Sequence, residues 1–183
     1  MDRQEALDIL HEHTASESLR KHAYAVEAAM RAYALRFAED PELWGIVGLL
    51  HDFDYEKWPE APDHTQEGAK ILRARGVGEE IVEAVLSHAQ YNAIPRDTPL
   101  KRTIFAVDEL CGLITAVAYV RPSKLIADVK VKSVKKKMKD KAFSRAVNRD
   151  EIREGAKLLE LELDEHIQVV LEAMQGAHEA LGL

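Results

Sequence analysis

Residues 44–55 read Trp-Gly-Ile-Val-Gly-Leu-Leu-His-Asp-Phe-Asp-Tyr, so that seven uncharged residues lead directly into a histidine and an aspartate. The uncharged run predicts a buried helix, which begins after Asp40-Pro41, an N-cap residue followed by a first-turn proline. An imidazole and a carboxylate at the end of a buried helix lose their water, and a bound metal ion would compensate for that loss. The dipeptide alone is common by chance, so its meaning depends on the rest of the chain.

The rest of the chain is also helical in pattern. Its 183 residues include only nine glycines and six prolines, and no Asn-Gly, Asp-Gly or Gly-Gly pair marks a β-hairpin. Bulky residues recur at intervals of three and four along residues 19–37, which indicates a helix with one buried face. The sequence therefore predicts a single all-α domain of seven to nine helices over residues 1–183. The second expected helix starts with a capping box of Thr14 and Glu17 and ends at Phe37. Basic helices are expected within residues 123–146. The other expected helices span residues 3–13, 43–52, 63–75, 79–90, 99–120 and 148–175.

Composition excludes several classes of protein. Apolar residues make up 46% and charged residues 31% of the chain, which is typical of a globular domain and not of a collagen or a disordered protein. The single cysteine, Cys111, cannot form a disulfide within one chain. The longest uncharged apolar run is far shorter than the roughly 18 residues of a membrane span, and the N-terminus lacks the apolar region of a signal peptide. We therefore expect a cytoplasmic protein with no membrane partner.

Four of the eight histidines lie in or at the end of separate predicted helices, and one aspartate lies in the middle of another. Asp108 interrupts the apolar stretch of residues 103–113, where a carboxylate needs a cation or several hydrogen-bond donors. Four imidazoles and two carboxylates suit one or two divalent ions of Mn, Fe, Co, Ni or Zn. The candidate ligands are His22, His51, Asp52, His64, His88 and Asp108. The remaining histidines have charged neighbours and are expected at the surface or rim: His11, His13, His166 and His178.

The order of these ligands resembles that of the HD-domain superfamily of metal-dependent phosphohydrolases. In that family an isolated His, a His-Asp doublet and a distal Asp follow one another, and two-metal members add histidines between the doublet and the distal Asp. The segments 48–55 and 108–114 are similar to those of uncharacterised bacterial HD hydrolases. The resemblance covers about residues 18–120 and implies a helical bundle around a metal site, with basic and C-terminal helices over residues 121–183. It implies hydrolysis of a phosphate ester of a nucleotide or another small phosphorylated compound.

The resemblance also implies roles for the six ligands. The first ion would be held by the isolated histidine, the doublet and Asp108. Asp52 would bridge to a second ion, which His64 and His88 complete, and the ions would activate a water molecule for attack on phosphorus.

Residues near the doublet are candidates for proton transfer and substrate binding. Asp54 or Glu56 would act as general acid or hold a ligand imidazole in place. Aromatic side chains in the loops would either stack a base or pack the loops down: Tyr55, Trp58 and Tyr91. The basic residues expected to bind the phosphate are Lys57, Arg96, Lys101, Arg121 and Lys124.

Other readings remain open at this point. The same ligand order occurs in two-iron oxygenases built on this scaffold, such as inositol oxygenase. Residues 121–149 carry eleven Lys or Arg and two Asp, a net charge of +9 in a chain of net charge −7, so a non-catalytic module that binds an anion or a nucleic acid is a further alternative. Because the whole chain is acidic, we expect nucleic-acid binding to be unlikely. The last helix would pack either on the core or on a second subunit in a homodimer, through Ile167, Val170, Leu171 and Met174.

Overall fold

The computed structural model describes residues 1–183 and contains helices and no strands, as the sequence predicted. There are ten α-helices, one more than the expected upper number, because the last predicted helix is two helices and a four-residue helix follows them. In chain order the elements are α1 (Arg3–His13), α2 (Glu17–Phe37), α3 (Pro41–Leu50), α4 (Asp63–Ala74), α5 (Glu79–His88), the 3₁₀-helix η1 (Gln90–Asn92), α6 (Pro99–Tyr119), the 3₁₀-helix η2 (Ile126–Asp128), α7 (Val131–Met138), α8 (Arg149–Leu158), α9 (Leu163–Gly176) and α10 (His178–Leu181).

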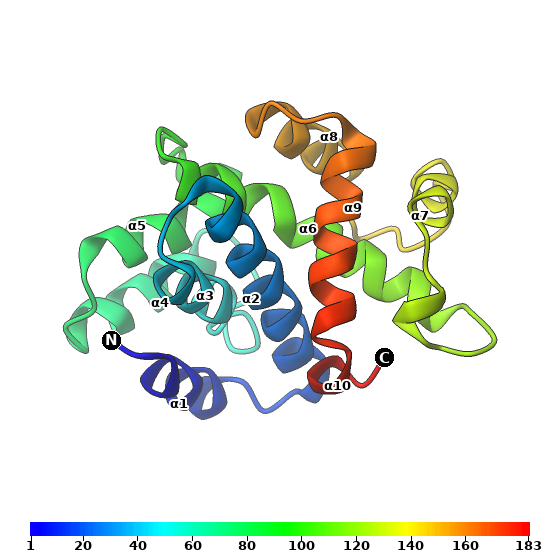
Figure 1. Cartoon of the computed structure of the whole chain (residues 1–183). Helices are drawn as coiled ribbons and strands as arrows, with labels where there is room; N and C mark the ends of the chain where they lie inside the picture. The colour runs from blue at the N-terminus through cyan, green and yellow to red at the C-terminus, as the bar shows by residue number, and fades with distance from the viewer.

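The long helix α6 is the centre of the bundle. It passes behind α2 and α9 in Figure 1 and packs against both, while α5 contacts its N-terminal part and α8 lies across it. One continuous apolar core joins these helices, and its largest fully buried side chains include Tyr33, Phe53 and Leu10. No helix is both long enough and apolar enough to cross a membrane.

The first helices begin at side-chain caps. Asp2 and Glu5 form a capping box at α1, and the Asp40 carboxylate accepts the Glu42 N–H at the start of α3. The capping box predicted from Thr14 is wrong, because Ser16 is the N-cap of α2. Thr14 ends α1 instead, and its hydroxyl donates to the Phe53 carbonyl at 3.0 Å. That bond ties the start of the bundle to the loop after the His-Asp doublet.

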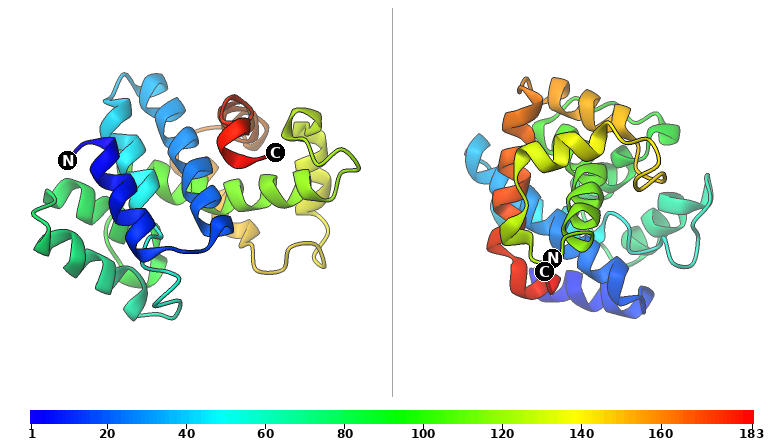
Figure 2. Two further views of the ribbon diagram at one scale, coloured as in Figure 1. Left: turned by 90° about the horizontal axis from the view of Figure 1, so that it is seen from below. Right: turned by 90° about the vertical axis from the view of Figure 1, so that its right-hand side faces the viewer.

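The region after α6 is less helical than the sequence predicted. Between residues 121 and 148 only η2 and α7 are helical, and Figure 2 shows α7 at the end of α6 opposite α4 and α5. The predicted 148–175 helix breaks between α8 and α9, where Glu160 has a φ of +57°. A left-handed residue ends a helix, and this one is not a glycine, so composition gave no sign of the break.

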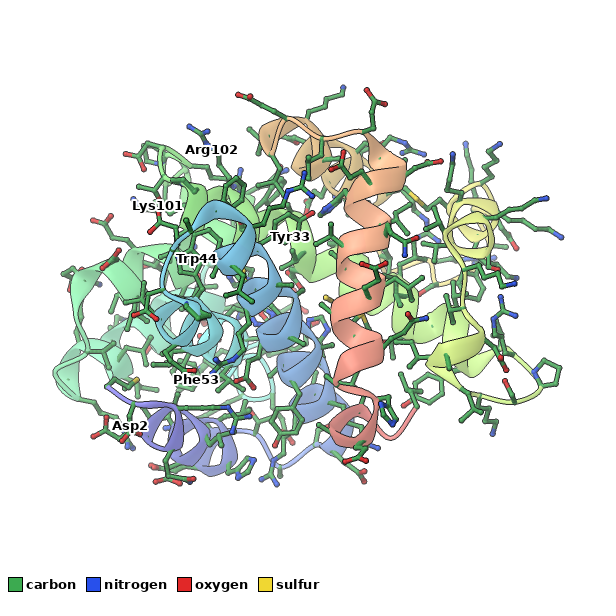
Figure 3. The ribbon with its side chains drawn as sticks, viewed as in Figure 1. Asp2, Tyr33, Trp44, Phe53, Lys101 and Arg102 are labelled. Atoms are coloured by element: carbon green, nitrogen blue, oxygen red, sulfur yellow. The ribbon has the colours of Figure 1, made fainter.

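The apolar stripe of α9 packs on the core of its own chain. Ile167 and Val170 are fully buried, so this stripe is not a free surface for a second subunit. His166 is buried too, which corrects its expected surface position. Its Nδ1 lies 2.6 Å from the hydroxyl of Tyr33, whose ring sits between α2 and α9 in Figure 3, and its Nε2 lies 2.9 Å from the Ala106 carbonyl. Only an N–H can donate to that carbonyl, so Nε2 carries a proton. Burial lowers the pKa of this imidazole to about 4, so the ring is neutral at pH 7 and Nδ1 accepts from the tyrosine.

Candidate metal centre

Five helices bring the predicted ligands to one point. His51 and Asp52 follow the last residue of α3, where the apolar run has buried the helix and leaves the doublet at its inner end. His22 lies in α2 and Asp108 in the middle of α6, on the faces where these two helices contact each other. His64 and His88 come from the first turn of α4 and the last turn of α5.

The first group of donors surrounds one oxygen of the doublet aspartate. His51 Nε2 lies 3.5 Å from Asp52 Oδ2, 3.5 Å from Asp108 Oδ1 and 3.3 Å from His22 Nε2. His22 Nε2 in turn lies 2.9 Å from Asp108 Oδ1 and 4.0 Å from Asp52 Oδ2. Four ligand atoms from three helices therefore lie within 4.8 Å of one another.

The second group surrounds the other oxygen of the same carboxylate. His64 Nε2 and His88 Nε2 each lie 3.2 Å from Asp52 Oδ1. The centroids of their imidazole rings are 5.4 Å apart, and the ring planes are inclined at 65°. Asp52 thus belongs to both groups, one through each carboxylate oxygen.

The far nitrogen of three imidazoles is held by the protein. His51 Nδ1 donates to the Gly48 carbonyl at 2.8 Å and His88 Nδ1 to the Val85 carbonyl at 2.6 Å, each within its own helix. His64 Nδ1 lies 3.0 Å from the carboxylate of Asp54. Such bonds fix the ring orientation and the tautomer, and leave Nε2 as the nitrogen that faces the centre.

Asp54 has no free oxygen for proton transfer. Its Oδ2 accepts the Gly68 N–H at 2.9 Å, its Oδ1 faces His64, and the residue is 1% exposed. Of its two predicted roles, the structure supports the positioning of a ligand imidazole and contradicts that of general acid. Glu56 does neither, because its carboxylate accepts the N–H groups of Ala15 and Ser16 before α2.

A strained backbone places His64. The next residue, Thr65, has a φ of +65°, which is costly for a β-branched side chain and persists only where neighbours enforce it. The Tyr91 hydroxyl donates to the His64 carbonyl at 2.9 Å, and the Asn92 amide donates to Thr65 Oγ1 at 2.7 Å and to the Leu86 carbonyl at 2.8 Å. The segment around Asn92, which was expected to be a loop, thus links α4 to α5 by hydrogen bonds. No sequence signal indicated this role for Asn92.

Electrostatics in the centre favour a cation. Burial lowers the pKa of His51, but the carboxylates of Asp52 and Asp108 outweigh it and raise that pKa well above its ordinary value. Burial likewise opposes ionisation of Asp52 and Asp108, yet the surrounding imidazoles hold the pKa of both carboxyls below the ordinary value. The same competition raises the pKa of His64 to about 9. A set of imidazole nitrogens around two ionised carboxylates, with no Lys or Arg among them, matches the donor preferences of divalent transition ions.

A cavity of about 390 Å³ opens onto both groups. Beyond the ligands its wall is formed mainly by Tyr55, Gln90, Tyr91, Glu109 and Glu151, and it contains no Lys or Arg. Burial raises the pKa of Glu109 to about 7, and the neighbouring charge of Asp108 adds to the effect. Glu109 and Glu151 were not predicted as site residues, although Glu109 directly follows a proposed ligand in the sequence.

The five basic residues predicted to bind phosphate lie elsewhere, and the structure corrects that prediction. Lys57 lies 4.2 Å from the centroid of the Trp58 ring. Lys101, labelled in Figure 3, lies near the start of α6 and pairs with Glu83 at 2.8 Å. Arg96 stacks 3.7 Å from the Phe105 ring and donates to the Ser87 carbonyl, so it braces the end of α5. Arg121 donates to Ser133, and Lys124 lies in the turn before η2 with a φ of +55°. None of the five lines the cavity.

Comparison with known proteins identifies the family. No curated protein and no solved structure matches this chain. The sequence model of one protein family, described as the HD domain, matches residues 19–113, about half of the chain. The matched segment contains the His-Asp doublet and all six side chains that converge in the structure. The chain therefore belongs to the HD domain family.

Proposed function

We propose that this protein is a metal-dependent phosphohydrolase that cleaves a phosphate ester of a nucleotide or another small phosphorylated compound. The HD domain superfamily is of the metal-dependent phosphohydrolase type, and the cluster of histidines and aspartates could hold a metal. The observation that carries the proposal is the shared carboxylate of Asp52, whose two oxygens face separate donor groups. One carboxylate between two such groups is the arrangement expected of a paired-ion site for phosphoryl transfer.

The position of each residue determines which ion it would hold. His22, His51 and Asp108 would hold one ion on Asp52 Oδ2, while His64 and His88 would hold the other on Oδ1. When bound, such ions supply Lewis acidity that activates water and stabilises the charge on the phosphoryl oxygens. Asp54 and the Gly48 and Val85 carbonyls keep the ligand rings oriented, so that the donors need little rearrangement.

The residues of the cavity wall favour a substrate with an aromatic or polar portion. Tyr55 and Tyr91 are 39% and 46% exposed and line the cavity together with His64. Either ring could stack a base, whereas Trp58 is not part of the wall.

The test is metal analysis of the purified protein followed by phosphate release from nucleotides and sugar phosphates with Mn, Fe, Co, Ni or Zn. We expect about 2 bound equivalents, about 1 in His64→Ala or His88→Ala, and almost none in Asp52→Ala. His178→Ala removes an exposed imidazole of α10 and serves as the control. Oxygen consumption with a strict iron requirement and no phosphate release would instead identify a two-iron oxygenase. Salt-sensitive nucleic-acid binding that survives Asp52→Ala, without turnover, would favour a binding module.

A further inference from the structure

The end of the molecule beyond α6 carries cations that no carboxylate of the protein neutralises. Residues 121–149 contain eleven Lys or Arg, and only two of them form an ion pair, Lys135 with Asp164 and Lys137 with Asp140. Of the fourteen basic residues elsewhere in the chain, nine pair with a carboxylate. Seven basic residues of the segment are exposed and form no ion pair: Lys124, Lys130, Lys132, Lys136, Lys139, Lys141 and Arg145.

The outer face of α7 holds three of these lysines in a row. Val134 and Met138 are buried on the opposite face of this helix, which packs against α6 and α9. Lys132, Lys136 and Lys139 follow one another at intervals of four and three, so they lie along one side of the helix, turned away from the two buried residues. Because packing fixes the helix, the three ammonium groups face solvent together.

Apolar side chains are exposed at the same end. Eight large apolar or aromatic residues of the chain are exposed, and three of them lie within seven positions: Tyr119, Val120 and Leu125. Val120 and Leu125 are 58% and 51% exposed and bracket the turn after α6. Figures 1 and 2 show this turn and α7 together at the end of α6 that is opposite α4 and α5. Exposed apolar residues grouped beside unpaired cations are typical of an interaction surface.

We propose that residues 119–141, here called the basic end, bind the surface of an anionic lipid bilayer. Such a bilayer offers phosphate and carboxylate groups to the lysines, and an apolar layer beneath them to Val120 and Leu125. A nucleic acid would also attract the lysines, but its phosphate backbone offers nothing to two aliphatic side chains.

This surface is separate from the metal centre. None of residues 119–141 lines the cavity beside the ligands, so the inference goes beyond the proposed hydrolysis and does not depend on it. The expectation of no membrane partner rested on the lack of a long apolar run, and contact with the surface of a bilayer requires no such run.

The experiment measures sedimentation of the full chain with lipid vesicles. One set of vesicles contains equal parts of phosphatidylserine and phosphatidylcholine, and the other contains phosphatidylcholine alone. We expect at least about tenfold tighter binding to the anionic set, and a smaller preference as salt screens the charges. The combined change Lys132→Gln, Lys136→Gln and Lys139→Gln should weaken binding at least about tenfold, because each lysine near an anionic surface contributes about fivefold. The matched control removes three exposed cations of α4 and α8 and should leave binding unchanged: Lys70→Gln, Arg73→Gln and Lys157→Gln.

A second variant separates a bilayer from a nucleic acid. Val120→Ser combined with Leu125→Ser keeps every charge but removes both exposed aliphatic side chains. It should weaken binding to the anionic vesicles at least about threefold and leave binding to a DNA duplex unchanged. Thermal unfolding of each variant checks that the fold is retained.

Three results would overturn the inference. The first is equal affinity for the two sets of vesicles, and the second is undiminished binding by either the lysine or the serine variant. The third is tighter binding to a DNA or RNA duplex than to anionic vesicles, which would assign the basic end to a nucleic acid instead. No part of this experiment requires a bound metal or turnover, so phosphate release tests the proposed function separately.

Discussion

The carboxylate of Asp52 shows why single side chains in this protein could be predicted from the sequence. Each of the six converging residues is ionisable, and His51, Asp52 and Asp108 end or interrupt strongly apolar helices, which is a strong local signal. The sequence signal of Asp54 and Glu56 was weaker, because the sequence of a loop indicates neither the hydrogen-bond partner nor the burial of a carboxylate. Lys101 and Arg96 could not be placed either, since their partners, Glu83 and the end of α5, come from a different segment.

Asp54 should control the affinity of the second donor group. Asp54→Asn keeps the size of the side chain but replaces the carboxylate that faces His64 Nδ1 with an amide. Loss of such an outer contact typically weakens metal binding about 10–100-fold. We expect the second bound equivalent to weaken by that amount in a chelator-competition titration, while the first is retained. Asp97→Asn, which removes the carboxylate that pairs with Lys101 at 3.3 Å, is the control, and equal loss in the two variants would contradict this role.

His166 should make stability dependent on pH. Burial lowers its pKa to about 4, against an ordinary value of 6.5, so between these values the unfolded chain binds a proton that the folded chain does not. The contribution of His166 to the free energy of unfolding is therefore complete above pH 6.5 and is lost as pH falls towards 4. The total loss is about 3 kcal/mol, at 1.36 kcal/mol per pKa unit.

Urea unfolding at pH 7 and pH 5.5 measures this effect. His166→Gln should be less stable at pH 7, because it disturbs the contacts to Tyr33 and Ala106, but should lose about 1 kcal/mol less on acidification than the natural chain. His178→Gln is the matched control on an exposed histidine. An unchanged pH dependence in His166→Gln would show that another group is responsible.

The helices differ in how far the sequence determines them. The ends of α2 and α6 agree with prediction because long stretches of periodic apolar residues lie between clear stops. The sequence did not predict the break between α8 and α9 or the irregular stretch around α7. Lys and Glu favour helix wherever tertiary contacts do not forbid it, so these segments were expected to be helical. Here a left-handed Glu160 and the bonds of Arg149 to backbone carbonyls outweigh that preference.

Close packing of α8 on α6 should tolerate no methyl group. A Cβ at Gly155 would lie 2.5 Å from Ala106 Cα, whereas a Cβ at Gly176 of α9 meets nothing within 4 Å. Gly155→Ala should therefore destabilise the fold by about 1–3 kcal/mol through overpacking. Gly176→Ala should be neutral or stabilise it by up to about 1 kcal/mol, from helix propensity. Thermal unfolding of the two variants compares them, and equal melting temperatures would contradict the close approach.

The chain as a whole places its charges unevenly. Its single core was foreseeable from length and composition, and so was the basic segment of residues 121–149. The position of that segment was not. It lies mostly around α7, at the far end of α6 from α4 and α5, so most of its lysines cannot serve the metal centre (Figure 2). Only residues near its C-terminal end, Ala146 and Val147, reach the cavity wall.

Metal binding should stabilise the entire fold, because the ligands come from five helices that meet only in the folded state. A ligand that binds only folded protein adds about 2.7 kcal/mol at a concentration one hundred times its dissociation constant. We expect Mn or Zn to raise the melting temperature, a chelator to reverse the rise, and Asp52→Asn to abolish it. The rise should shrink as pH falls, since protons compete for the imidazoles. A melting temperature that ignores both ion and chelator would contradict a buried centre.

If two ions bind as proposed, the shared carboxylate of Asp52 would also make their two positions unequal in occupancy. A cation settled on Oδ2 withdraws charge from Oδ1, so an ion arriving at His64 and His88 meets a poorer donor and a like charge nearby. Filling should proceed in order, with a half-occupied form present whenever the ion is scarce. The concentration of metal would then set the proportions of a form with one ion and a form with two ions.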